Sequence, residues 1–431
     1  MSKTGFVLGT FKGRTLRWGG PHNVLLVGGQ RSGKGIGVII PSLLEMAGHA
    51  VVIDIRGETW QATAGWRSQF SRCLKMSLMQ AGSARFSLPQ AIRKRTPYEF
   101  MDAAIMAEVA MEPPDDTARD NPHWHGTARA ALTCGLLYEV HTRLRPTLAH
   151  MASFWSQPGK QHTQIIEVIR DTAPTKEVAE LAQELLNKEA RELSSVLSTM
   201  TRQLFLYRDP LVAANTSVCD FQIEDFTRHD AFLSLYIVLS REEQQYLRLF
   251  LRMFLRIMLG RWLEMGGPPH QITLILDEFP SLGKLAFLAE ELGVLGGRGI
   301  RTLIAAQNVP QLRVYGDTDV ITEQCKVRLY FAAQGQTTGR EISRQTGMGT
   351  ATTMQTSYRA EGWSWAMADA RTQQEHIHGR PLLTESEAMQ LPEDVVIIQV
   401  AGHPPIYGRK LQFWRKRVWR QRSQLPAPGG T

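Results

Sequence analysis

A glycine-rich loop that ends in a lysine is the stretch whose residue types and spacing most clearly predict chemistry. Residues 28–34 read GGQRSGK and follow the apolar run of residues 24–27. This is the Gly-x4-Gly-Lys spacing of a phosphate-binding loop, in which backbone N–H groups face an oxyanion and the lysine reaches the β and γ phosphates. The sequence therefore predicts a nucleotide site made by Gly28, Gly29, Gln30, Arg31, Ser32, Gly33, Lys34, Gly35 and Ile36.

Two acids at the end of a later apolar run form the second half of the predicted site. Residues 272–276 are apolar and lead into Asp277 and Glu278. In nucleotide hydrolases an acid at this place holds Mg²⁺, and its neighbour polarises the attacking water. Since Gly35 stands where Ser or Thr usually ligates Mg²⁺, we expect Asp277 to be the metal ligand and Glu278 the catalytic base.

Gln307 ends another apolar run, residues 302–306. At the end of a buried strand beside the acids, its amide is placed to sense the γ-phosphate and the water. The simpler alternative is a polar residue that only caps the strand.

The elements that must position these residues are strands of a parallel sheet. Apolar runs at residues 24–27, 50–55, 232–239, 272–276, 302–306, 327–331 and 395–400 predict buried strands. After the loop we expect a helix to about Met46, with a kink or an end at Pro41. Strand, loop, helix and strand form a βαβ unit, so the predicted fold class is α/β with a mainly parallel sheet. Residues 1–22 are predicted as a lead-in, and residues 350–375 as a long mobile hairpin or loop.

Helical periodicity replaces strand signals between residues 97 and 206. This change predicts an all-helical domain inserted into the sheet, either as a structural bundle or as a binding module. The expected division is residues 1–96 and 207–420 for the nucleotide-binding domain, 97–206 for the insertion and 421–431 for a disordered tail. On a later helix, Arg248, Arg252 and Arg256 share one face. A solvated face is the favoured interpretation, and a surface for a subunit or nucleic acid the alternative.

The net charge of +8 comes almost entirely from the C-terminal segment. Residues 395–431 contain no acid and seven cations, namely Arg409, Lys410, Arg415, Lys416, Arg417, Arg420 and Arg422. Aromatic residues lie between them, so the segment could bind DNA or acidic lipid headgroups, or form a solvated basic edge strand and helix. The sequence has neither an apolar run of about 18 residues nor a signal peptide, which predicts a soluble, cytoplasmic chain.

Taken together, these motifs resemble the coupling proteins of type IV secretion and conjugation systems. The resemblance runs from about residue 17 to 413, and the family commonly has Gly after the loop lysine, as Gly35 here. The stretches that carry it are GGQRSGKGIGVIIP, DIRGE with TAGWR, LDEFPSLGKL, GIRTLIAAQNVPQL with YG, and RPLLTESEAMQLP with GHPPI.

The resemblance implies a RecA-like P-loop ATPase that uses ATP and Mg²⁺ and works as a hexameric ring around DNA. Such a ring receives a relaxase with its attached strand, or an effector protein, and passes it to the channel at the inner face of the bacterial inner membrane. The helical insertion would face the cytoplasm and take part in recognition. Arg298 would reach the nucleotide of a neighbouring subunit, with Arg301 as the alternative. The family usually begins with transmembrane helices, which this sequence does not show.

Three functions remain open at this stage. The leading one is a motor that translocates DNA and protein. The second is a substrate receptor that binds ATP and hydrolyses it slowly. The third is a DNA pump of the same superfamily with no role in secretion.

Overall fold

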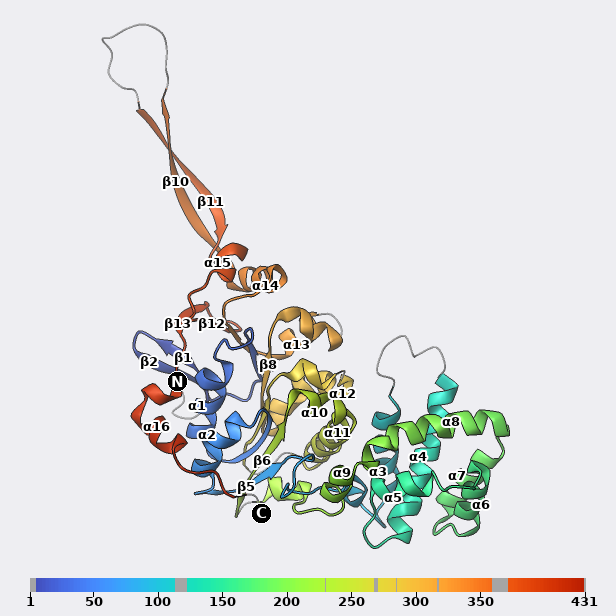
Figure 1. Ribbon diagram of the computed structural model, residues 1–431. Coiled ribbons are helices and arrows are strands. Elements are labelled where there is room, and N and C mark those ends of the chain that lie inside the picture. The colour runs from blue at the N-terminus through green and yellow to red at the C-terminus, as the bar shows by residue number, and fades with distance from the viewer. Residues whose placement is uncertain are drawn as a thin grey trace, which may run out of the picture.

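A large twisted sheet forms the centre of the protein (Figure 1). The computed structural model describes residues 5–112, 122–228, 230–266, 270–283, 285–315, 318–358 and 371–429. The strand order is β2-β1-β13-β12-β9-β3-β8-β7-β4-β6-β5. The strands are β1 Phe6–Phe11, β2 Arg14–Trp18, β3 Val24–Val27, β4 His49–Ile55, β5 Ser71–Met76, β6 Phe232–Leu239, β7 Ile272–Leu276, β8 Ile300–Ala306, β9 Val327–Tyr330, β12 Val395–Val400 and β13 Ile406–Arg409.

The strands from β9 through β5 are parallel, and the remaining four extend one edge as antiparallel strands. Continuous apolar runs such as β3 and β7 are buried along their whole length, as parallel strands covered on both faces require. The predicted α/β class with a mainly parallel sheet is therefore confirmed.

Residues 1–22 were predicted only as a lead-in, and this was wrong. Residues 6–18 form the β1–β2 hairpin, which turns at Lys12 and Gly13 with φ angles of 48° and 77°. Gly9, Thr10 and the polar residues of β2 interrupt the apolar pattern, so the hairpin has no run that sequence reasoning would read as a strand. Strands β5 and β13 were not predicted either.

Helices cover both faces of the sheet (Figure 1). The phosphate loop leads into a π-helix, Gly35–Ile39, which continues as α1; Pro41, which has no backbone N–H to donate, lies just after the change from π-helix to α-helix, and the helix does not end there. The helices of this part are α1 Ile40–Glu45, α2 Glu58–Arg67, α9 Pro210–Asn215, α10 Arg241–Tyr246, α11 Arg248–Glu264, α12 Ala286–Leu295, α13 Thr318–Gln324, α14 Gln336–Thr346, α15 Glu385–Met389 and α16 Arg417–Ser423.

The predicted helical region lies to one side of the sheet (Figure 1). Helix α3 packs against α11, and one continuous apolar core joins this region to the sheet. None of the described helices is long and apolar enough to cross a membrane. The helices are α3 Glu99–Met111, α4 Pro122–Thr142, α5 Leu148–Phe154, α6 His162–Asp171, α7 Lys176–Leu186 and α8 Ala190–Gln203.

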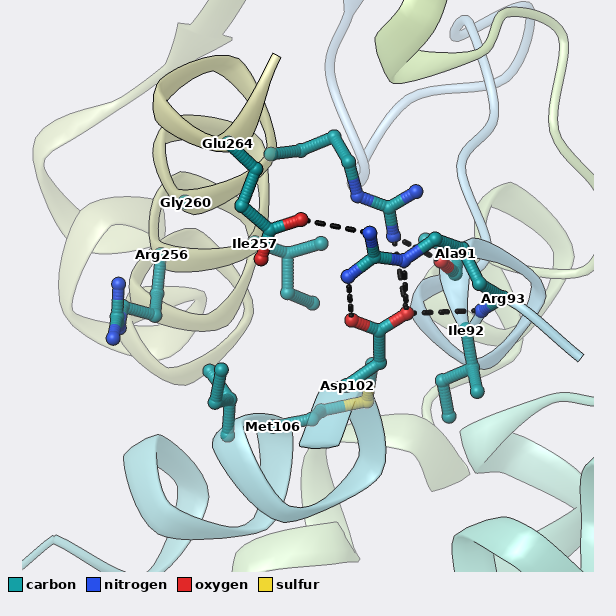
Figure 2. A pocket seen from close by; sticks show the side chains of 11 residues that line it. Ala91, Ile92, Arg93, Asp102, Met106, Arg256, Ile257, Gly260 and Glu264 are labelled. Atoms are coloured by element: carbon teal, nitrogen blue, oxygen red, sulfur yellow. Dashed lines mark hydrogen bonds and ion pairs between the residues drawn. The ribbon is translucent and has the colours of Figure 1, made fainter. Parts of the chain in front are cut away.

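A charge network fastens α3 to α11 (Figure 2). The Asp102 carboxylate accepts hydrogen bonds from Arg93 Nε at 2.8 Å and from Arg93 Nη2 at 2.6 Å, and a third from Arg261 Nη2 at 3.2 Å. Arg93 also pairs with Glu264, and Arg261 pairs with Glu224. Because Asp102 and Arg261 are largely buried, removing one of them would leave the charge of the other without its partner.

The predicted solvated face on α11 was wrong for Arg252, which is buried and paired with Glu112 at the end of α3. Arg256 lies over the ring of Phe287 and points away from Asp102 in Figure 2. The helical region covers this face of α11, which helical periodicity alone predicts to be exposed to solvent.

A two-stranded hairpin projects from the body (Figure 1). Its strands are β10 Met348–Tyr358 and β11 Arg371–Pro381, paired in antiparallel register along their whole length. The predicted hairpin is thus confirmed for these strands, and residues 359–370 lie outside the described residues.

The predicted disordered tail, residues 421–431, was wrong for its described part. Helix α16 extends to Ser423, and Ala427 packs against an apolar cluster of the sheet. At Gly65 on α2, an added Cβ would lie 2.1 Å from the Leu425 carbonyl oxygen, so the segment crosses α2 at a point where only glycine fits. Residues 430 and 431 lie outside the described residues.

Candidate nucleotide site

The loop between β3 and the π-helix has the backbone of a phosphate cradle. Gly28 N donates to Ala306 O at 3.1 Å, which extends the β3–β8 ladder to the start of the loop. The chain then turns tightly, with positive φ angles at Arg31 (56°) and Gly33 (92°). Gly37 N donates to Gly33 O at 2.9 Å and so begins the helical turn. This is the strand–loop–helix context that the Gly-x4-Gly-Lys spacing requires.

The Lys34 ammonium lies inside the loop. Its Nζ donates to Gly28 O at 2.6 Å and to Gly29 O at 3.1 Å. Burial lowers the pKa of Lys34, while the carboxylates of Glu278 and Asp277 act in the opposite direction. A buried cation thus faces two acids across the cleft, an arrangement that suits a ligand with several negative charges bound together with a metal ion.

A cleft of about 480 Å³ opens at the carboxyl ends of the central strands. Ligand sites in α/β sheets lie at this edge, and small-molecule pockets have volumes of about 300–1,000 Å³. The cleft brings together most of the predicted site residues, while Gly28 and Gly29 are not in its described lining and lie against Phe331 and Gln334. Its lining consists of Gln30, Arg31, Ser32, Gly33, Lys34, Gly35, Ile36, Ile40, Asp54, Ile55, Arg56, Glu58, Thr59, Arg241, Gln244, Asp277, Glu278 and Gln307.

The two acids and Gln307 meet because β7 and β8 are neighbours in the sheet. Glu278 has left-handed backbone angles (φ 55°, ψ 41°), uncommon for a residue other than glycine, and turns the chain directly after Asp277. The Gln307 amide donates to the Glu278 carboxylate. Burial raises the pKa of Asp277 to about 6, an effect that Lys34 opposes and Glu278 strengthens.

Sequence reasoning missed Asp54 at the end of β4. Asp54 is buried and accepts hydrogen bonds from Trp60 N at 2.6 Å and Thr59 N at 3.3 Å, so it caps the first turn of α2. Burial raises its pKa to about 6. Since Ile53 pairs with Leu276, Asp54 and Asp277 follow neighbouring strands at the same level. The available signal was an apolar run that ends in an acid.

The cleft fits a phosphate-bound Mg²⁺ ion. Among the described residues, no group of three His, Cys, Asp or Glu side chains could hold a metal by itself. Mg²⁺ is commonly bound by one or two carboxylates together with phosphate oxygens and water. Asp277 supplies a carboxylate, and an added Cβ at Gly35 would meet no described atom within 4 Å, so this position leaves room for water.

Arg298 and Arg301 lie at the amino-terminal end of β8, on the side of the sheet away from the cleft. Arg298 is exposed in the short turn before β8, and Arg301 lies within the amino-terminal part of β8 with only 5% of its surface exposed. Neither belongs to the described lining of the cleft. An arginine at this end of β8 cannot complete the site of its own chain.

This chain is similar to proteins of conjugative DNA transfer. Residues 3–428 match the family described as type IV secretory system conjugative DNA transfer. A conjugal transfer protein TraG of Escherichia coli is 32% identical over 96% of this chain and 70% of its own length. Protein VirD4 of Agrobacterium fabrum is 25% identical over 95% of this chain and 62% of its own length.

Solved structures of the conjugative coupling protein TrwB have the same fold. An unbound form covers 99% of this chain and 92% of its own, with a TM-score of 0.64 at 16% identity. A complex with the ATP analogue ADPNP covers 96% and 90%, with a TM-score of 0.69 at 16% identity. From the match over nearly its whole length, this chain belongs to the type IV secretory system conjugative DNA transfer family.

Proposed function

We propose that this protein is an ATP-driven coupling protein that passes DNA, with its attached relaxase, and effector proteins to a type IV secretion channel. The observation that carries the proposal is the meeting of Lys34, Asp277, Glu278 and Gln307 in one cleft of a conjugative DNA transfer protein. TrwB is described in complexes with ADP and Mg²⁺ and with ADPNP, which supports ATP and Mg²⁺ as the ligands here.

In this proposal each side chain has a role in hydrolysis. Lys34 exchanges its bonds to the Gly28 and Gly29 carbonyls for bonds to the β and γ phosphates, and the loop N–H groups bind the remaining phosphate oxygens. Asp277 holds Mg²⁺, which neutralises charge on the phosphates when bound. Glu278 accepts the proton of the attacking water, and Gln307, already bonded to Glu278, positions that water.

The proposed assembly is a hexameric ring at the inner face of the inner membrane. Arg298 supports a ring, because it is exposed just before β8, away from the cleft of its own chain. It can therefore contact a bound nucleotide only in a neighbouring subunit. Arg301 is the alternative, although its burial argues against it. The helical region is proposed to recruit the relaxase, the effector or a channel component.

The test is ATP hydrolysis across a range of protein concentrations, with and without single-stranded DNA. Turnover per chain should rise with concentration and with DNA, because each site would be completed by a neighbour. Arg298→Ala should lower turnover and leave ATP binding by the isolated chain unchanged. Negligible turnover at every concentration, despite measurable ATP binding, would instead identify a receptor that has little motor activity.

The exposed part of the C-terminal segment is proposed as an anionic contact surface. Arg415, Arg417 and Arg420 are exposed beside Trp414 and Val418, which are 41% and 55% exposed. Such a surface fits DNA phosphates and bases or acidic lipid headgroups.

Replacing Arg415, Arg417 and Arg420 together by Ala should weaken binding to that partner. For single-stranded DNA, the slope of log K against log salt should fall by about 2, since about 0.7 is expected per phosphate contact. Sedimentation with vesicles of acidic lipid tests the other partner. Unchanged binding in both assays would refute the proposed contact.

A further inference from the structure

Residues 410–427, the part of the C-terminal segment that follows β13, pack along the helix that begins at the phosphate loop. The carbonyl oxygen of Leu411 lies 3.0 Å from the place of an added Cβ at Gly37 in the π-helix. Trp419 is buried and donates through Nε1 to Glu45 at 3.0 Å. Arg422 donates to Leu44 O at 2.5 Å. The segment therefore follows the π-helix and α1 along their length.

Lys410, at the start of this segment, contacts the phosphate loop itself. Its Nζ donates to Ser32 O at 3.0 Å and lies 4.0 Å from the centre of the Phe331 ring. Phe331 in turn packs against Gly28 at the start of the loop. Lys410 is not among the described residues that line the cleft, so it holds the loop from outside.

Several interactions fix the position of Lys410 against the loop. The backbone N–H of Lys410 donates to Asp394 O at 2.6 Å, which fixes the position of the side chain's base. A bond from an ammonium to a carbonyl is stronger than one between neutral groups, and the Phe331 ring adds a cation–π contact. Ser32 lies at the tight turn of the loop, between Arg31 and Gly33 with their positive φ angles. The contact therefore acts at the tight turn of the loop.

We propose that Lys410 is a positioning residue of the nucleotide site, which holds the phosphate loop in its binding conformation from outside. The affinity for ATP then depends on the docked C-terminal segment, and the charge of Lys410 adds to that of Lys34 near the phosphates. This inference rests on the proposed binding of ATP at the loop.

The experiment compares Lys410→Met, Lys410→Arg and Lys416→Met. Lys416 is a matched control, because it belongs to the same segment and lies 4.5 Å from the centre of the Trp419 ring, while its hydrogen bond goes to Thr15. ATP affinity is measured by calorimetry with Mg²⁺, the KM for ATP and kcat by steady-state hydrolysis, and the unfolding temperature without nucleotide.

Lys410→Met should weaken ATP binding and raise KM by about tenfold, the effect of losing one charge-assisted hydrogen bond. Its kcat at saturating ATP should stay near that of the wild type, and its unfolding temperature should fall about as much as that of Lys416→Met, which also loses one hydrogen bond and one cation–π contact. Lys410→Arg should restore most of the affinity, and Lys416→Met should bind ATP normally. Normal ATP binding by Lys410→Met, or an equal loss in Lys416→Met, would overturn the inference. A wild-type protein that binds no ATP would instead refute the proposed function.

Discussion

Replacing Glu278 by Gln is expected to lower the rate of ATP hydrolysis by about 10²- to 10⁴-fold, the usual contribution of a general base. The substitution keeps the shape of the side chain and a group that can pair with the Gln307 amide. It removes the ability to accept a proton from water, together with one negative charge beside Lys34 and Asp277. ATP binding should therefore persist, because the phosphate loop and Lys34 are untouched. Hydrolysis and ATP affinity, measured on the same preparation, separate these two effects.

The control is Glu242→Gln, the same chemical change at an exposed residue of α10. Its neighbours Arg241 and Gln244 line the cleft, whereas Glu242 is not part of the described lining. This variant should hydrolyse ATP at the normal rate. A Glu278→Gln protein with normal turnover would show that another group activates the water.

The fold could be predicted where most residues of a strand are apolar. β3, β4, β6, β7 and β8 satisfy this condition, since a central parallel strand is covered on both faces. β5, at the edge of the sheet, contains Ser71, Arg72 and Lys75 among its six residues, and β13 contains Gly408 and Arg409. Such strands are held by their partners in the sheet, which a local pattern does not reveal.

The site could be predicted where a polar residue directly ends an apolar strand, as Asp277, Glu278 and Gln307 do. Parallel strands then bring those ends together. The contact between Lys410 and Ser32 joins residues 378 positions apart and has no counterpart in local spacing. Arg252 shows the same limit, because helical periodicity defines a face of α11 and not the helix that covers it.

Asp277→Asn should have opposite effects on function and on stability. The amide cannot replace the carboxylate as a ligand for Mg²⁺, so Mg²⁺-dependent ATP hydrolysis should fall by at least about 10²-fold. In the nucleotide-free protein, however, the folded state should become more stable, because a buried carboxylate beside Glu278 is removed. The exposed Asp171 on α6 provides the control, and Asp171→Asn should change neither property.

The stability gain should depend on pH in a defined direction. The pKa of Asp277 is raised from 3.8 to about 6 in the folded state, so the folded protein binds the extra proton between these values. The wild type should therefore gain stability as the pH falls from 7 to 4, and Asp277→Asn should lack this part of the gain. At pH 7.5 the variant should be more stable by about 2 kcal/mol, at 1.36 kcal/mol per pKa unit and with allowance for solvent near the cleft. Urea unfolding across this pH range measures the difference. Equal stability of the two proteins at pH 7.5 would show that the buried charge of Asp277 does not destabilise the folded state. The charged Asp277 carboxylate thus lowers the stability of the fold and supplies a ligand for Mg²⁺. Such a residue is expected at a site where selection favours metal binding over stability.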